Sequence, residues 1–498
     1  MSRRPKDREL KLIRTRLADE RGTIRKDAPE RLVLLYPSPY RAGMSSLGFQ
    51  TIYREVNQTP GRVAERAFLP DDAKAFRAAR TPLFSYESER PVADFPVVAV
   101  SVAYEIELAG LIDCLELASI PVFAEDRDER HPVVLAGGPL TFSNPVPLAP
   151  YADAILMGEA DETVHQALDI LYSGLRRDDA LRALASEIDS CFVPSIHGDA
   201  LPPLGKSSRI PAFAQIVTPH TELRNMFLIE GERGCSRGCA YCVMRRSTNG
   251  GMRIVPMEKV LERIPDDVPR VGLVGAAISD HPQIVDLVNT LADQGKEVGL
   301  SSLRPDKIKP PFAAALRRAG HRTLTTAMDG ASQRLRDTVD RRARIHHLER
   351  AATMVREHGF DRLKLYLIVG LPTEEDDDID ELIEFSTELS KIAPISLGIA
   401  PFVSKRNTPL DRLPFAGIDV VDRRLKKLRR GVKGRVDVRS TSARWAWVEY
   451  VLAQGGIAEG RAVYDAVKSG GRFRDYQQAF SALASPSTKP SRKLEVVR

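Results

Sequence analysis

Cysteine, tryptophan and long apolar stretches are all scarce in this sequence. The chain has 5 cysteines and 2 tryptophans among 498 residues. Cysteines so few, and odd in number, exclude a disulfide-built scaffold and fit a reducing compartment. The most apolar stretch, residues 96–123, is interrupted by Glu105, Glu107, Asp113 and Glu116, which excludes a bilayer-spanning helix of about 20 apolar residues. We therefore expect a cytoplasmic protein with no membrane span.

A strong excess of either charge is also missing. Lys and Arg total 73 against 67 Asp and Glu, a formal net charge of +6. This small surplus falls short of the basic surface that nucleic-acid binding needs, so nucleic acid is not an expected partner. The charged segment 1–28 has no apolar centre of the kind that a secretory signal contains, and we expect it to be an N-terminal tail. The length predicts two or three domains of about 150 residues each.

Four short apolar runs without alternation lie in residues 29–198. They are Leu32–Tyr36, Val97–Val102, Val133–Ala136 and Ala154–Met157. Such runs, separated by amphipathic stretches, are typical of strands buried on both faces of a parallel sheet. This region is therefore predicted to be an open α/β domain with a Rossmann-like sheet. Glycines follow two of the strands, at Gly137–Gly138 and at Gly158; they indicate either a ligand site at the strands' carboxyl ends or only tight turns.

The alternation of strands and helices starts again after a proline-containing linker, residues 199–222. Six apolar runs follow: Met226–Ile229, Val271–Val274, Val298–Ser301, Leu324–Ala327, Leu363–Val369 and Ser396–Ala400. The segment 223–412 spans roughly 190 residues, whereas a complete eight-stranded barrel needs about 250. We therefore expect a partial (β/α)6 TIM-like barrel. The acidic run 374–378 behind Thr373 predicts the start of a capped helix.

The C-terminal region is predicted to be mostly helical from residue 413 to 484, with a disordered tail at 485–498. Its basic run, residues 423–430, is open to an RNA-binding interpretation. However, Val421, Leu425, Leu428 and Val432 form an apolar stripe at helical spacing, so the charges are also explained as the solvated face of a helix.

Three cysteines lie close together directly after the first barrel strand. Cys235, Cys239 and Cys242 have CxxxCxxC spacing within the segment 231–242. Three thiolates on one loop can hold a [4Fe-4S] cluster and leave one iron open to a small molecule. Arg233 and Arg237 are expected to offset the negative charge of the thiolates. Barrel enzymes place catalytic groups at this end of the strands.

Structural zinc is the competing interpretation of these cysteines. Zinc in such sites normally takes four protein ligands. No histidine lies between Thr221 and Asp280, and Cys114 and Cys191 belong to the other predicted domain. The spacing therefore favours an iron–sulfur cluster, with a non-enzymatic metal-stabilised module as the alternative.

The residues Cys235, Cys239, Tyr241 and Cys242 resemble the signature of radical S-adenosylmethionine (SAM) enzymes. Segments such as YPSPYRAGMSSLGFQ, VVLAGGP, MGEADE, SSLRPDKI and KLYLIVGLPTEEDD are similar to a subgroup in which a cobalamin-binding-type Rossmann domain precedes the barrel. The resemblance implies that the open iron binds SAM and that one-electron reduction cleaves it to a 5′-deoxyadenosyl radical. It also implies an electron donor such as flavodoxin or ferredoxin and an unknown, small-molecule substrate.

The resemblance also implies which residues contact SAM. Cys235, Cys239 and Cys242 would be the metal ligands, and Tyr241 would lie beside the adenine. The remaining expected contacts with the cofactor are Gly275, Ala276, Arg304, Asp329, Ser332 and Gly370. Arg304 would bind a carboxylate, or it is only a surface arginine beside Pro305. Asp329 stands where the subgroup usually has a glutamate, so its reach to the ribose is shorter.

Cobalamin is a further cofactor suggested by the resemblance. Cobalamin-dependent relatives often carry an Asp-x-His-x-x-Gly motif, whereas this chain has no histidine before His131. Cobalamin would then bind without a protein ligand to cobalt, or the domain keeps only the fold. A cobalamin-assisted methyltransferase and an enzyme that modifies RNA or protein therefore remain as alternatives to a radical enzyme acting on a small molecule.

Overall fold

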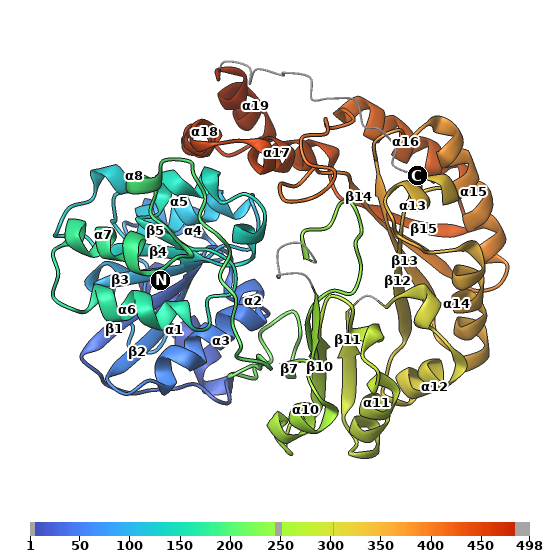
Figure 1. Ribbon diagram of the computed structural model, residues 1–498, viewed down its shortest axis with the longest axis horizontal. Coiled ribbons are helices and arrows are strands. Elements are labelled where there is room, and N and C mark those ends of the chain that lie inside the picture. Colours follow the sequence, from blue (N-terminus) through green and yellow to red (C-terminus); the bar gives the residue numbers. More distant parts are fainter. Residues whose placement is uncertain (1–4, 245–250, 302, 484–498) are drawn as a thin grey trace.

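The structure, a computed structural model, describes residues 5–244, 251–301 and 303–483. Figure 1 shows two parts side by side, each built on a sheet covered by helices, with the last helices lying above both. No helix in these described ranges combines the length and the apolar character needed to cross a bilayer.

The first part is an open sheet with the strand order β2-β1-β3-β4-β5-β6. Its strands are β1 (Glu30–Tyr36), β2 (Arg62–Phe68), β3 (Val97–Ser101), β4 (Val133–Gly137), β5 (Ala154–Leu156) and β6 (Cys191–Phe192). Neighbours pair in parallel except β5 and β6, which are antiparallel. The four predicted strands are confirmed. β2 was not predicted because its sequence, RVAERAF, mixes charged and apolar residues although every residue in it is buried.

Both faces of this sheet are covered by helices. The main ones are α3 (Leu47–Gln58), α5 (Glu107–Leu117), α6 (Thr163–Leu171) and α7 (Arg177–Glu187), with the shorter α2 (Tyr40–Gly43), α4 (Ala73–Ala78) and α8 (Pro194–His197). Along β1, Val33 and Leu35 belong to the core that includes α5, whereas Leu32 and Leu34 belong to the core that includes α3 and α6. This alternation explains why the strand reads as one continuous apolar run.

The expected N-terminal tail is largely a helix, α1 (Pro5–Asp19). Ile13 and Leu17, four residues apart on one face, are 1% and 8% exposed and join the core over α3. Much of the segment expected to be a charged tail therefore packs on the first part. Its two buried apolar residues are hard to recognise in the sequence because charged residues surround them.

The barrel part consists of parallel strands in two sheets. One has the order β11-β10-β7 and the other β12-β13-β14-β15. The strands are β7 (Met226–Glu230), β10 (Arg270–Val274), β11 (Glu297–Leu300), β12 (Thr323–Asp329), β13 (Arg362–Val369), β14 (Ile395–Pro401) and β15 (Val436–Ser440). A parallel bridge between Leu303 and Thr326 links the two sheets. The predicted partial barrel is confirmed, and β15 continues it past residue 412, where an alternating sequence, VDVRS, gave no apolar run.

Helices cover the outside of the barrel. They are α10 (Met257–Arg263), α11 (Ile284–Asp293), α12 (Pro310–Arg318), α13 (Gln333–Thr338), α14 (Ile345–His358), α15 (Asp376–Ser390) and α16 (Ile418–Gly431). α16 contains the basic run, and Val421, Leu425 and Leu428 on it are buried as the helical stripe predicted. The predicted acidic helix start is α15, where Asp378 accepts a hydrogen bond from the Glu375 backbone N–H at 2.8 Å.

The C-terminal region is helical as predicted and packs on the first part. Its helices are α17 (Ala443–Gln454), α18 (Ile457–Lys468) and α19 (Phe473–Ser481). Val448, Leu452 and Phe480 lie in the same apolar core as α5. The Tyr151 hydroxyl donates to the Gly460 carbonyl at 2.5 Å. These helices therefore join the barrel to the first part (Figure 1). The predicted tail at 485–498 lies outside the described residues.

Candidate active site at the cysteine loop

The three predicted metal-ligating cysteines lie on one loop at the carboxyl end of β7. The loop follows β8 (Glu232–Gly234), which pairs antiparallel with β9 (Met252–Ile254). The Ala240 backbone N–H donates to the Val339 carbonyl at 3.0 Å, and the Ala240 carbonyl accepts from the Leu410 N–H at 3.3 Å. The loop is thus held from both sides, at a position where a parallel barrel places functional groups.

Cys239 lies close enough to Cys235 and Cys242 to raise the pKa of both. Cys239 is 7% exposed, and Cys235 and Cys242 are half-buried. Burial raises the pKa of Cys242, and the nearby Cys239 and Cys235 raise it further. Nevertheless, within the described part of the chain no three His, Cys, Asp or Glu side chains are gathered closely enough to hold a metal ion. These described residues therefore present no preformed ligand set for a single ion such as zinc.

Tyr241 and Asp329, both predicted to contact SAM, lie together. The Tyr241 hydroxyl donates to Asp329 Oδ2 at 2.7 Å, and Arg341 Nε lies 2.7 Å from the same oxygen. Arg341 Nη1 is 3.9 Å from Cys239 Sγ. Asp329 ends β12 with φ of 60°, a left-handed conformation that is costly for this residue type and that recurs at functional sites. Arg341 thus connects the end of β12 to a cysteine, and no sequence motif marked it.

Gly275 and Ala276 line a cavity of about 410 Å³ together with Glu232 and Ser301. The Ala277 backbone N–H donates to Glu232 Oε1 at 2.7 Å, and a Cβ at position 275 would collide with the Glu232 carboxylate. Glu232 is 1% exposed, and Oε2 has no hydrogen-bond partner in the described residues. Burial raises the pKa of Glu232 to about 7. The sequence did not single out this acid, although it precedes Cys235 by only three residues.

Three other predicted contacts are occupied by the protein itself. Arg304 forms ion pairs with Asp280 and Asp306. The Ser332 hydroxyl donates to Asp378 at 2.5 Å and caps α13. The Gly370 N–H donates to Glu374 Oε1 at 2.8 Å. A carboxylate contact by Arg304 would therefore require it to leave its aspartates, and all three assignments stay predictions.

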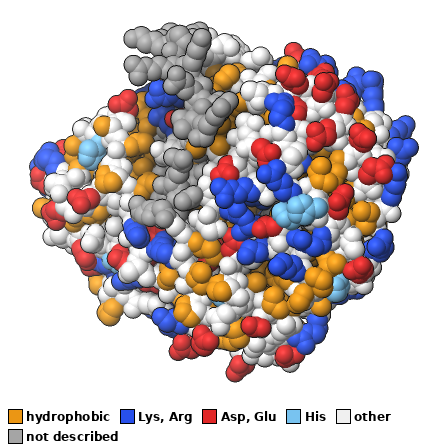
Figure 2. Space-filling model, turned by 45° about the vertical axis from the view of Figure 1, so that its right-hand side comes forward, with side chains coloured by type: hydrophobic (Ala, Val, Ile, Leu, Met, Phe, Trp, Pro, Cys, Tyr) orange, Lys and Arg blue, Asp and Glu red, His pale blue; other side chains and the backbone are white. Residues whose placement is uncertain are grey.

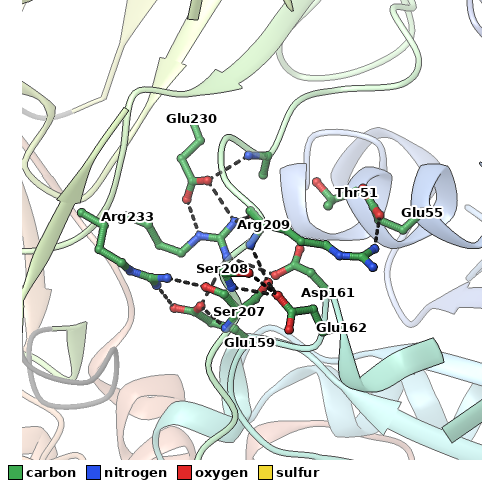
Figure 3. A network of polar contacts seen from close by, with 12 residues as sticks. Thr51, Glu55, Glu159, Asp161, Glu162, Ser207, Ser208, Arg209, Glu230 and Arg233 are labelled. Atoms are coloured by element: carbon green, nitrogen blue, oxygen red, sulfur yellow. Dashed lines mark hydrogen bonds and ion pairs between the residues drawn. The ribbon is translucent and has the colours of Figure 1, made fainter. Parts of the chain in front are cut away.

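Arg233 pairs with carboxylates of both parts of the molecule. Its Nε donates to Glu230 Oε1 at 2.6 Å, and its Nη1 donates to Asp161 at 3.1 Å and to Glu159 at 3.4 Å (Figure 3). Arg253 also pairs with Glu159. The expectation that Arg233 offsets the thiolate charge is not met, since the arginine beside a thiol is Arg341. The MGEADE segment of the first part instead binds the strand that leads into the cysteine loop.

The linker takes part in the same junction. Ser207 N donates to Glu159 Oε2 at 2.8 Å, and Arg209 Nη1 pairs with Glu55 on α3 at 2.7 Å (Figure 3). The Ala212 N–H of the linker donates to Glu230 Oε2 on β7 at 2.9 Å, so the linker contacts both parts of the molecule.

A second cavity, of about 330 Å³, lies between the first sheet and helices α3 and α6. Its mainly apolar lining includes Ile52, Gly138, Gly158 and Val164, and Met244 from the cysteine loop closes it. Gly138 and Gly158 have φ of 106° and 81°, so they form tight turns and also border a cavity. The two interpretations of these glycines are thus compatible.

Two protein-family models match the chain. "Radical SAM proteins, N-terminal" matches residues 48–194, and "Radical SAM superfamily" matches residues 229–386, which include the cysteine loop. The chain belongs to the radical SAM superfamily. Membership implies SAM and an iron–sulfur cluster as cofactors, and it makes the protein an enzyme whose substrate is not identified by these matches.

Among curated proteins, the chain is 22% identical to an uncharacterized protein of Methanocaldococcus jannaschii, covering 80% of this chain and 84% of that one. It is 24% identical to a 2-(S-pantetheinyl)-carbapenam-3-carboxylate methyltransferase of Streptantibioticus cattleyicolor, over 60% of this chain and 47% of the methyltransferase. The chain thus spans about half of that enzyme.

Among solved structures, the apo form of the cobalamin-dependent SAM radical enzyme OxsB is similar with a TM-score of 0.54 and 10% identity. The match covers 90% of this chain and 72% of OxsB. At this identity the likeness shows the shared fold alone.

Proposed function

We propose that Cys235, Cys239 and Cys242 hold a [4Fe-4S] cluster and that the enzyme cleaves SAM reductively to act on a small molecule. The main support is the CxxxCxxC loop at the carboxyl end of β7, where Cys239 lies close enough to Cys235 and Cys242 to raise the pKa of both. When bound, the cluster supplies the electron and the open iron site for SAM. A flavodoxin- or ferredoxin-type protein is the expected electron donor.

The remaining residues would position SAM and exclude water. Gly275 allows close approach to the buried Glu232, whose free Oε2 is available to an ammonium group. Tyr241 is fixed through Asp329, which supports its predicted place beside the adenine. Arg341 supplies positive charge next to Cys239. Water exclusion matters because a reactive radical is otherwise quenched.

The test is anaerobic reconstitution with iron and sulfide, followed by incubation with SAM and a reductant. We expect about four irons per chain and formation of 5′-deoxyadenosine. Cys239→Ala should abolish 5′-deoxyadenosine, whereas Cys191→Ala, which removes a thiol in β6, should retain it. One tightly bound zinc per chain, or 5′-deoxyadenosine from Cys239→Ala, would refute the proposal.

A cobalamin-assisted methyl transfer is the second candidate, favoured by the apolar cavity between the first sheet, α3 and α6. This cavity lies at the strands' carboxyl ends, where open α/β sheets bind ligands, and Met244 brings the cysteine loop to it. Because the chain lacks the Asp-x-His-x-x-Gly motif, it would not supply that motif's ligand to cobalt. Retention of hydroxocobalamin through gel filtration, with S-adenosylhomocysteine as a product, would support this candidate, and neither would occur if the domain keeps only the fold.

Modification of RNA is less well supported. On the face shown in Figure 2, basic and acidic side chains are interspersed over the surface. Two of the basic residues of α16 form ion pairs within the protein. Arg424 pairs with Glu374, just before α15, and Lys427 pairs with Asp380 on α15. RNA binding with a steep salt dependence would reverse this assessment.

A further inference from the structure

A third cavity, of about 550 Å³, lies where the first part, the barrel and the C-terminal helices meet. The first part contributes Tyr104 and Ile106, which follow β3, and the cysteine loop contributes Tyr241. The barrel contributes the carboxyl ends of β13, β14 and β15, and α17 closes the cavity with Trp445 and Glu449. The cavity is therefore adjacent to the proposed cluster but is not formed by the barrel alone.

The walls of this cavity are apolar and aromatic. Tyr104 and Trp445 are 47% and 38% exposed, which is unusual for large side chains and leaves ring surface available to a ligand. Trp445 is fixed by an edge contact with Tyr476, with 5.4 Å between ring centroids. Ile368 and Phe402 add aliphatic and aromatic surface from the barrel strands. Such walls suit a flat, mainly apolar ligand.

The charges in the cavity leave one carboxylate in excess. Lys405 Nζ contacts both oxygens of Glu105, at 2.8 and 2.7 Å, and Glu449 Oε1 at 2.8 Å. The Glu105 side chain is 2% exposed, whereas that of Glu449 is 29% exposed. Burial raises the pKa of Tyr104, and the nearby Glu107 and Glu449 raise it further. One ammonium thus balances two carboxylates, and the accessible one is Glu449.

We propose that this cavity binds the substrate and that the substrate is a small planar molecule carrying a protonated amine. Glu449 binds the ammonium group, and Tyr104 and Trp445 contact the ring and add cation–π attraction. A ligand carboxylate in the same place would be repelled by Glu449. The residues that line the cavity include no cation free to balance it. Tyr241 places the ligand beside the cysteine loop. The proposal rests on the proposed function, because it names the substrate class of the same site.

The test compares two probes with the same ring and opposite charge, tyramine and 3-(4-hydroxyphenyl)propionate. Binding is measured by isothermal titration calorimetry on the reconstituted holoenzyme, anaerobically, with saturating SAM and no reductant. We expect tyramine to bind at least about tenfold more tightly than the propionate. Because SAM fills its own site, binding under these conditions reports a separate place.

Variants then assign the effect to the cavity. Glu449→Gln should weaken tyramine binding about tenfold and remove the preference over the propionate. Trp445→Ala should weaken both probes, since it removes ring contact and leaves the charge. The control, Glu388→Gln, removes a surface carboxylate paired with Lys391 and should leave both affinities unchanged. Melting temperatures confirm that each variant is folded.

Three results would overturn the proposal. They are equal or undetectable binding of the two probes, an unchanged preference in Glu449→Gln, and competition between tyramine and SAM, which would make the cavity part of the SAM site. Each can occur while 5′-deoxyadenosine still forms, so failure here is distinguishable from failure of the proposed radical chemistry. Conversely, tyramine selectivity in a chain that binds only zinc would retain the cavity and reject the chemistry.

Discussion

Two arginines, the buried Arg66 and the partly buried Arg233, are each surrounded by carboxylates, and the difference between them separates structure from function. Arg66 is 0% exposed and lies within the first part. Its two Nη atoms donate to Glu20 at 2.8 and 2.7 Å, and its Nε donates to Glu87 at 2.6 Å. Arg233 instead contacts acids from both parts of the molecule and lies two residues before Cys235.

The comparison teaches that a cluster of one arginine with several carboxylates can serve either to stabilise one part of the molecule or to join two parts. The Arg66 cluster ties the segment after α1 to β2 and contains no element of the barrel. The Arg233 cluster joins the loop after β5 to the strand that precedes the cysteines (Figure 3). We therefore expect changes at Arg66 to act on stability and changes around Arg233 to act on the cysteine loop.

The largest expected effect is on stability, from Arg66→Met. The change leaves Glu20 and Glu87 buried without their cation, which should lower the free energy of unfolding by about 3–5 kcal/mol. Urea denaturation followed by circular dichroism measures it. Arg14→Met, which breaks an exposed pair with Glu89, is the control and should cost less than about 1 kcal/mol. Equal losses in the two variants would contradict the comparison.

Glu374 extends the comparison of buried arginine–carboxylate pairs, because only one of its two carboxylate oxygens has a partner in the described residues. Its Oε1 accepts from Arg424 at 3.0 Å, but Oε2 has no partner in the described residues. Burial raises the pKa of Glu374 from 4.5 to about 7, despite Arg424, and Asp378 adds to the rise. Its contribution to stability is therefore complete below pH 4.5 and is lost as the pH rises through about 7.

Comparison with Glu374→Gln isolates this titration. Between pH 4.5 and 8, the stability of the unchanged protein relative to the variant should fall by up to about 3 kcal/mol. Melting temperatures of both proteins across this range measure the change. A difference that stays constant with pH would show that Glu374 is ionised throughout.

A smaller effect, on activity, is expected from the acids that hold Arg233. Asp161→Asn removes a carboxylate of the first part that contacts Arg233 at 3.1 Å. Because outer partners orient the groups near a metal centre, we expect about a tenfold slower formation of 5′-deoxyadenosine and altered electron paramagnetic resonance of the reduced cluster. Glu162→Gln is the control, since Glu162 binds Ser207 and Ser208 in the same network. Equal effects of the two variants on 5′-deoxyadenosine formation would show that the contact with Arg233 has no particular influence on the cysteine loop.

The smallest effect is expected from Tyr241→Phe. The variant loses one hydrogen bond to Asp329, which keeps its ion pair with Arg341. We expect a loss of about 1 kcal/mol, seen as a roughly fivefold higher KM for SAM with little change in iron content. Loss of the cluster itself would instead show that the hydroxyl holds the loop together.

Much of the fold was predictable because most strands are continuous apolar runs. β1, β3 and β4 were found in this way, since burial on both faces leaves no alternation to hide them. β2 and β15 were missed for the opposite reason. β2 buries its charged side chains in ion pairs, and β15 has alternating exposed polar residues, so neither shows an apolar run.

The candidate site divides in a similar way. Cys235, Cys239, Tyr241 and Cys242 are neighbours in the sequence, so their spacing was readable. Glu232 and Arg341 were not, because their importance depends on contacts with Ala277 and Cys239 that the fold creates. The ion pair of Arg304 with Asp280 could not be predicted for the same reason, since Asp280 approaches it from another loop.

The return of α17–α19 to the first part has a consequence for biosynthesis. Seven residues of these helices complete a core whose other buried residues come from the first part of the chain: Val448, Leu452, Ala462, Val463, Ala466, Tyr476 and Phe480. A ribosome adding about 5–20 residues per second needs on the order of tens of seconds to travel from the first sheet to these helices. During that interval the nascent chain carries an uncovered apolar face, which makes it a natural client for chaperones.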